Sequence, residues 1–107
     1  MVALAPQAAG LERLELREQT MLDTRRATTG KVSIVGHRGA TASAPENTLA
    51  SFREGWRQGA DFIELDVRLT ADGHVVAFHD DILDRTTDGR GPVAAHTLSE
   101  LKRLDAG

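Results

Sequence analysis

The chain has 107 residues, of which 40% are hydrophobic and 27% are charged, a balance typical of one modest globular domain. Its formal net charge of −3 argues against binding to nucleic acid or anionic lipid surfaces, because both need a basic surface. The absence of cysteine excludes disulfides and thiolate zinc sites. Any metal site would use carboxylates, histidine or carbonyl oxygens, which suit hard cations.

Two further features bear on location. No apolar run in the sequence approaches the ~20 residues that a membrane span needs. Residues 1–10 contain no Lys or Arg and no sustained apolar stretch, so they do not resemble a secretory signal. We therefore expect a cytoplasmic protein without a membrane span.

Residues 1–30 differ from the rest of the chain. Apolar residues recur there near one helical face, with charged residues between them: Leu11, Leu14, Met21 and Leu22. This pattern predicts an amphipathic helix over residues 11–26, followed by a linker at residues 27–30. An N-terminal extension that packs on the body of the domain is favoured over a partner-binding helix.

Two elements are predicted next in chain order. Residues 32–35 form a short β-branched run, which predicts a buried strand that ends in a glycine-flanked loop. A helix then begins at Asn47 or Thr48 and stops at Gly59. Along it Leu49, Phe52 and Trp56 recur at helical spacing, so we expect Phe52 and Trp56 to face the sheet.

Two more strands are predicted, over residues 61–67 and 75–78, separated by a turn at residues 70–73. A stretch rich in turn-forming residues follows at 85–92, and Thr97 and Glu100 form a capping box before a last helix. Alternating strand and helix favour an α/β fold with a parallel sheet. The short connection between the last two strands leaves two arrangements open, a hairpin or an extended crossover.

Glu64 and Asp66 are two residues apart on a predicted strand, so their carboxylates point to the same face. Burying two like charges is costly unless a positive charge joins them, and oxygen ligands suit Mg²⁺ or Ca²⁺. The alternative is an exposed polar face of an edge strand.

Other polar groups occur where strands end. Arg38 beside a glycine-rich turn suits phosphate recognition, and His37 or His79 could transfer protons near neutral pH. Each also has a structural interpretation, such as a surface loop. Glu46 and Asn47 fit the start of a helix. Parallel α/β folds place active sites at strand ends, so all these groups could share one site.

Six motifs occur in the order His37-Arg38-Gly39, Pro45-Glu46-Asn47-Thr48, Glu64-Leu65-Asp66-Val67, Thr70-x-Asp72-Gly73, His79-Asp80 and Arg85-Thr86-Thr87-x-Gly89. In order and spacing, this set resembles the glycerophosphodiester phosphodiesterase family over residues 32–107. The resemblance implies a TIM-type (β/α) barrel, which needs roughly 250 residues. We therefore expect a truncated chain, with an extension at residues 1–30 and the N-terminal part of the catalytic domain at residues 31–107.

The resemblance also implies the chemistry, which is metal-dependent hydrolysis of a small-molecule glycerophosphodiester to an alcohol and glycerol 3-phosphate. It implies that Glu64 and Asp66 hold one divalent cation, Mg²⁺ or Ca²⁺. Further roles follow for the other motif residues: His37 as base, His79 as acid, Glu46 orienting the site, and Arg38 and Asn47 on the substrate side.

Two alternatives remain open, phospholipase D-like cleavage of choline-bearing lipids and an inactive truncated fragment. For the connection before residue 75, the resemblance favours a parallel third strand that brings His79 to the site of Glu64 and Asp66.

Overall fold

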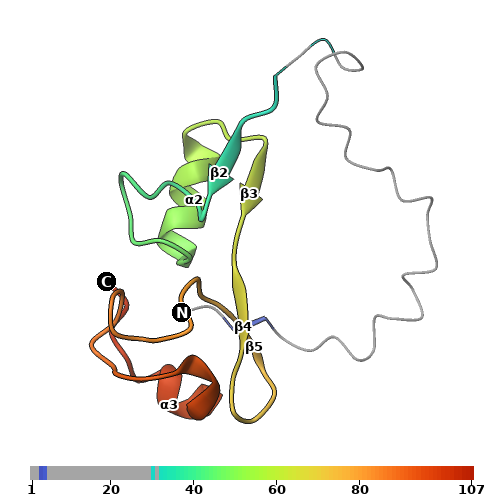
Figure 1. Ribbon diagram of the computed structural model, residues 1–107. Coiled ribbons are helices and arrows are strands. Elements are labelled where there is room, and N and C mark those ends of the chain that lie inside the picture. Colours follow the sequence, from blue (N-terminus) through green and yellow to red (C-terminus); the bar gives the residue numbers. More distant parts are fainter. Residues whose placement is uncertain (1–2, 5–29, 31) are drawn as a thin grey trace, which may run out of the picture.

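The computed structural model describes residues 3–4, 30 and 32–107 (Figure 1). The helix predicted over residues 11–26 lies outside the described residues. The elements, in chain order, are β1 (Ala3–Leu4), β2 (Val35–His37), α2 (Leu49–Arg57), β3 (Phe62–Glu64), β4 (Val67–Leu69), β5 (Val75–Ala77), the 3-10 helix η1 (Val93–Ala95) and α3 (Leu98–Leu101). Among the described residues, no helix is long and apolar enough to cross a membrane.

The strands form two small sheets. β2 and β3 pair in parallel, with His37 opposite Glu64, as the βαβ pattern predicts. The second sheet is antiparallel, with β5 between β1 and β4. β1 was not predicted from the sequence. Figure 1 shows β3 running on into β4, so that one extended segment connects the two sheets.

Helix α2 packs on the parallel pair, and its ends follow the predicted signals. The Thr48 side chain accepts a hydrogen bond from the Ser51 backbone N–H and so caps the first turn. After the helix, Gly59 adopts a positive φ of 89°, which glycine tolerates best. The choice between Asn47 and Thr48 as the cap is thereby settled in favour of Thr48.

The predicted buried face of α2 was wrong for Trp56, whereas Phe52 is half-buried beside Ile63 and Leu65. Ser51 and Gly55 are the buried residues of α2, whereas Trp56 is 62% exposed and Leu49 53% exposed. Small residues face inward because the helix lies very close to the chain beneath it. A Cβ at Gly55 would lie only 2.8 Å from Ile63 Cδ1.

The buried strand predicted at residues 32–35 was also wrong in its bounds and its burial. The strand begins only at Val35, and Val32, Ile34 and Val35 are exposed. Within the described residues β2 pairs with β3 alone, so its other edge presents backbone N–H and C=O groups without a strand partner.

The predicted strand over residues 61–67 divides into β3 and β4, and the parallel third strand was wrong. β5 folds back antiparallel on β4, with Val67 opposite Ala77. The connection is too short for a crossover but suits a hairpin, whose turn is closed by the Thr70 carbonyl accepting from Gly73 N–H. The hairpin returns the chain to the level of Asp66, whose carbonyl accepts from Phe78 N–H at 3.0 Å.

The main apolar core lies between β5 and the C-terminal segments. Its buried members are Val76, Phe78, Leu83, Val93 and Leu101, against which Leu98 and Leu104 pack. The predicted capping box of Thr97 and Glu100 is present and begins α3, which carries Leu101 into this core. The core therefore anchors the segment after β5 that carries several polar groups discussed below.

Candidate functional site

The loop after β2 is held in an unusual conformation at Arg38. Its φ of 55° lies in the left-handed region, which non-glycine residues seldom occupy. The Arg38 N–H donates to Glu64 Oε2 (3.2 Å), and its carbonyl accepts from Ser51 Oγ (2.6 Å) and Asn47 N–H (3.1 Å). Strained backbone of this kind persists only where its surroundings impose it, and it concentrates at functional sites.

Asn47 is the other described non-glycine residue with positive φ, at 56°. Its side chain is buried and forms two bonds to Asp66. Nδ2 donates to Oδ2 (3.1 Å), and Oδ1 accepts from the backbone N–H (3.2 Å). Both amide atoms are thus engaged in fixing Asp66, while the predicted contact of Asn47 with substrate stays a prediction.

The Arg38 guanidinium lies between two carboxylates. Nη1 donates to Glu46 Oε1 (3.2 Å), and Nε lies 3.1 Å from Asp66 Oδ2. The Nε contact is an ion pair without a hydrogen bond, so within the described residues this buried N–H has no hydrogen-bond partner. The Asp66 carboxylate nevertheless offsets the charge at this nitrogen.

The two predicted histidines have different partners. His37 is 70% exposed at the end of β2, with Nε2 3.8 Å from Glu64 Oε2. His79 follows β5, and its Nδ1 lies 2.6 Å from Asp80 Oδ1. Within the described residues, no hydrogen bond or ion pair joins His79 directly to another predicted site residue.

Arg85 links the Asp80 carboxylate, which contacts His79, to the Glu46 carboxylate, which contacts Arg38. Its Nε donates to Asp80 Oδ2 (2.7 Å) and its Nη2 to Glu46 Oε1 (2.6 Å). Hydrogen bonding by Arg85 is the main reason why the pKa of Glu46 lies below its ordinary value. The hydrogen bonds from Arg85, and then the one to His79, lower the pKa of Asp80 in the same way. The two carboxylates in turn raise the pKa of Arg85.

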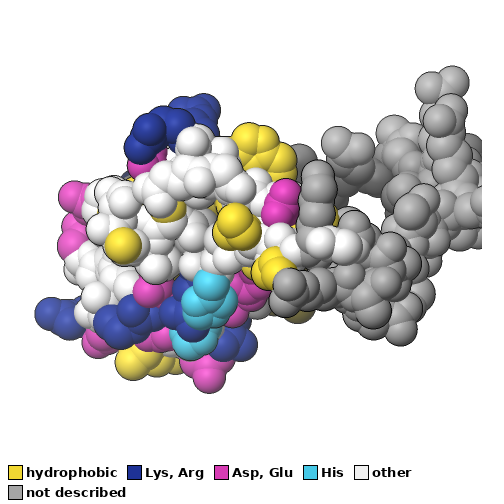
Figure 2. Space-filling model, turned by 90° about the horizontal axis from the view of Figure 1, so that it is seen from above, with side chains coloured by type: hydrophobic (Ala, Val, Ile, Leu, Met, Phe, Trp, Pro, Cys, Tyr) yellow, Lys and Arg dark blue, Asp and Glu magenta, His cyan; other side chains and the backbone are white. Residues whose placement is uncertain are grey.

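The predicted site residues therefore form one connected cluster. On the face drawn in Figure 2, histidine side chains lie beside basic and acidic ones. Four carboxylates share the cluster with two guanidinium groups, which leaves two negative charges in excess: Glu46, Glu64, Asp66 and Asp80 against Arg38 and Arg85.

The donor set suits a divalent cation in part. Glu64 Oε1 and Asp66 Oδ1 accept no hydrogen bond from the described residues, and two hard oxygens beside an excess of negative charge fit Mg²⁺ or Ca²⁺. Within the described part of the chain, no three His, Asp or Glu residues come close enough together to hold a metal ion. For such a cation, Glu64 and Asp66 would supply two protein ligands.

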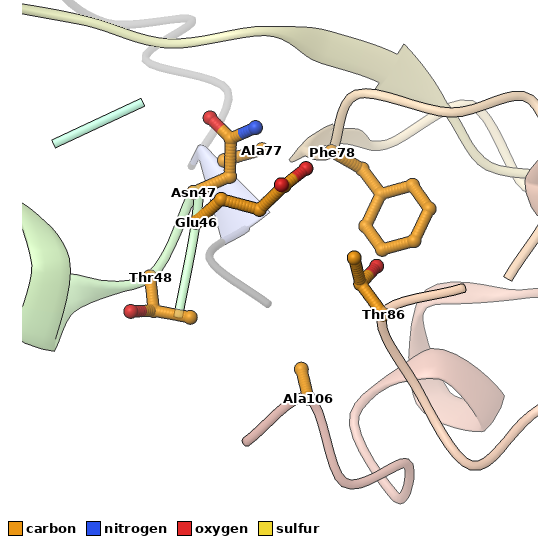
Figure 3. A pocket seen from close by; sticks show the side chains of 7 residues that line it. All are labelled: Glu46, Asn47, Thr48, Ala77, Phe78, Thr86 and Ala106. Atoms are coloured by element: carbon orange, nitrogen blue, oxygen red, sulfur yellow. The ribbon is translucent and has the colours of Figure 1, made fainter. Parts of the chain in front are cut away.

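A small cavity lies behind the cluster (Figure 3). The Glu46 side chain points from its loop toward Phe78, and Thr86 lies beside the Phe78 ring. The cavity volume is about 30 Å³, which is enough for a single water molecule. A substrate would therefore have to bind on the open side of the cluster.

The model of the glycerophosphoryl diester phosphodiesterase family matches residues 37–107. The chain belongs to this family. It is 53% identical over 77 residues to a glycerophosphodiester phosphodiesterase of Caldanaerobacter subterraneus, with 72% of this chain and 32% of the relative covered. A Bacillus subtilis relative of the same name is 48% identical over 77 residues, with 72% and 26% covered.

Solved structures of family members are also similar to this chain. A glycerophosphodiester phosphodiesterase from Agrobacterium tumefaciens superposes with a TM-score of 0.71 at 55% identity, covering 72% of this chain and 33% of that one. An Oleispira antarctica phosphodiesterase in complex with its product sn-glycerol 3-phosphate gives 0.70 at 49% identity, covering 76% and 33%.

The chain thus spans about a third or less of the length of these relatives. The relatives are TIM-type barrels, and the described residues have the α/β fold of the N-terminal portion of such a barrel, as predicted. The β2–α2–β3 unit is its βαβ element.

Sequence reasoning assigned no role to Asp80 or Arg85, although both belong to this cluster. The signal was present in the motifs His79-Asp80 and Arg85-Thr86-Thr87. The chemistry of Arg85 depends on Glu46, which is 39 residues away in the sequence, so only the folded chain reveals it.

Proposed function

We propose that this sequence forms the phosphate-binding and proton-transferring portion of a metal-dependent glycerophosphodiester phosphodiesterase. The observation that carries the proposal is the half-buried Arg38 guanidinium, which lies between the Glu46 and Asp66 carboxylates. The side chain is 18% exposed, and a guanidinium suits phosphate geometry. The product bound to the Oleispira relative, sn-glycerol 3-phosphate, supports this ligand class.

Two histidines at the ends of β2 and β5 would move the protons. His37 Nε2 takes the proton of the attacking hydroxyl, from water or from the neighbouring glycerol hydroxyl, as its oxygen bonds to phosphorus. The bond from phosphorus to the alcohol oxygen breaks, and His79 Nε2 protonates that oxygen. His79 uses this nitrogen because Nδ1 is engaged with Asp80.

The carboxylates of the cluster would bind the metal ion and orient Arg38. Glu64 and Asp66 would hold one Mg²⁺ or Ca²⁺, which would supply positive charge to the phosphate oxygens when bound. Asn47 and Arg38 N–H hold these two carboxylates in place. Glu46 orients the Arg38 guanidinium from the opposite side. We assign residues 31–107 to this catalytic portion and residues 1–30 to an extension.

The test is made in a hybrid enzyme, because the chain spans 32% of the Caldanaerobacter relative. The matching 77 residues of that relative are replaced by those of this chain. Release of glycerol 3-phosphate from glycerophosphocholine is then measured with Mg²⁺, with Ca²⁺ and with a chelator. We expect metal-dependent release that falls by about 10²–10⁴-fold in both His37→Ala and His79→Ala.

His96→Ala is the matched control. His96 bonds to the Pro92 carbonyl at the end of η1 and has no place in the cluster. The control should keep the turnover of the hybrid. A folded hybrid without turnover, or turnover that survives either active-site histidine change, would contradict the proposal.

A further inference from the structure

Six charged or ionisable side chains form a continuous row with alternating acidic and basic character. In order along the row they are Asp66, Arg38, Glu46, Arg85, Asp80 and His79, and we refer to them as the ion-pair row. Successive contacts measure 3.1, 3.2, 2.6, 2.7 and 2.6 Å. The row joins a proposed metal ligand at one end to a proposed proton donor at the other.

Arg85 is the link on which the row depends. It forms four hydrogen bonds, two to each of its neighbouring carboxylates. Nε and Nη2 donate to Asp80 at 2.7 and 2.9 Å, and Nη1 and Nη2 donate to Glu46 at 3.0 and 2.6 Å. Four of the five guanidinium N–H groups are used, so the position of the side chain is closely fixed.

An ordinary surface ion pair would contribute little, because solvent screens its charges and holding two long side chains in place costs entropy. This arrangement differs because the two carboxylates are largely covered. Glu46 and Asp80 have 19% and 22% side-chain exposure, beneath an Arg85 that is 49% exposed. The two segments that Arg85 joins, the loop before α2 and the chain after β5, both carry proposed site residues.

The charge of Asp80 sets the state of His79. A carboxylate that receives two Arg85 bonds is ionised and can only accept hydrogen bonds. The contact of 2.6 Å to His79 therefore requires a proton on His79 Nδ1. In the neutral ring, Nε2 is left as the nitrogen that gains and loses the transferable proton.

We propose that Arg85 is a positioning residue that fixes His79 in the Nδ1-protonated tautomer through Asp80 and aims the Arg38 guanidinium through Glu46. The proposal rests on the proposed function for the roles of His79 and Arg38. Arg85 itself acts through these neighbours, and the geometry assigns it no contact with substrate.

The experiment records the imidazole ¹⁵N spectrum of the 107-residue chain at a pH where the rings are neutral. His79 is assigned from the spectrum of His79→Gln. The variants are Arg85→Gln, which removes the charge, and Arg85→Lys, which keeps it but lacks the planar fork. Arg90→Gln is the matched control, because Arg90 is 81% exposed and its ion pair with Asp84, at 3.6 Å, lies outside the row.

We expect His79 to be predominantly Nδ1-protonated in the unaltered chain and in Arg90→Gln. In Arg85→Gln the two tautomers should become mixed, and Arg85→Lys should restore part of the original population. An unchanged His79 tautomer in Arg85→Gln would overturn the proposal, as would an equal change in Arg90→Gln.

If Arg85→Gln does not fold, Asp80→Asn replaces it. That change keeps Arg85 but offers His79 an amide in place of an ionised acceptor, so a mixed tautomer is again expected and an unchanged one would overturn the inference. The spectra report on Arg85 whether or not the hybrid enzyme turns over, so failure here is distinct from failure of the proposed function.

Discussion

Gly39 sets the geometry of the loop that holds Arg38, and its replacement by alanine should be unusually costly. Gly39 has a φ of 91°, and a Cβ there would overlap Ser51 Oγ and the Ser51 backbone. The left-handed conformation costs about 1–2 kcal/mol for a residue with a Cβ, and overpacking against fixed backbone adds about 1–3 kcal/mol. We therefore expect Gly39→Ala to lower the free energy of unfolding by about 2–5 kcal/mol.

Gly73→Ala is the matched control, because Gly73 has a similar φ of 79° but no atom within 4 Å of its added Cβ. The free energy of unfolding of Gly73→Ala should fall only by the cost of the left-handed conformation, about 1–2 kcal/mol. Both losses are measured by urea denaturation of the 107-residue chain, followed by circular dichroism. Equal losses in the two variants would refute the close packing of α2 on the 38–40 loop.

Three further predictions concern the core, the metal ligands and acid stability. Leu83 is fully buried, so Leu83→Ala should lower the free energy of unfolding by about 2–5 kcal/mol in urea titrations; a loss below about 1 kcal/mol would be inconsistent with this burial. Asn47→Ala removes both bonds that orient Asp66, so calorimetry should show about 10–100-fold weaker Ca²⁺ binding, and unchanged affinity would argue against Asp66 as a ligand. The Thr70 hydroxyl and then the Leu98 N–H lower the pKa of Asp72 from 3.8 to about 2. The folded-state pKa is depressed, so this stabilisation is complete above about pH 4 and lost as the pH falls toward 2. Between pH 4 and pH 2, the urea midpoint of Asp72→Asn should accordingly fall less than that of the unaltered chain. An equal fall in both proteins would exclude this role of Asp72.

Local signals predicted the ends of elements well. Thr97 and Glu100 satisfy each other's backbone within one turn, and Gly59 needs only its own conformational freedom. Neither depends on distant parts of the chain. The sequence alone was therefore sufficient for these positions. It placed Glu64 and Asp66 on one strand, whereas Glu64 ends β3 and Asp66 lies in the connection before β4.

Contacts between distant segments were not predictable in the same way. The apolar spacing of Phe52 and Trp56 indicated a buried face, but Phe52 is only half-buried and Trp56 is exposed. The approach of the 38–40 loop makes Ser51 and Gly55 the fully buried residues of α2. The hairpin of β4 and β5 depends on pairing that the resemblance did not reveal.

The electrostatic organisation of the site also needed the structure. Arg85 lies in a stretch whose sequence indicates only turns, and its partner Glu46 lies in a loop whose sequence fits a helix start. Hydrogen bonding across 39 residues carries no periodic signal in the sequence. The motif set nevertheless identified both segments as parts of one family pattern.

We propose that the residues around Arg38 form a phosphate site that needs a divalent cation. Titration of the ¹⁵N-labelled 107-residue chain with sn-glycerol 3-phosphate, with and without Mg²⁺ or Ca²⁺, tests it residue by residue. Because the cluster has two negative charges in excess, a phosphate dianion should be repelled until a cation binds. We predict saturable shifts at His37, Arg38 and His79 only when metal is present. The metal-dependent phosphate site would be contradicted by shifts that occur without metal, by shifts confined to the surroundings of the exposed Trp56, or by the absence of any shift.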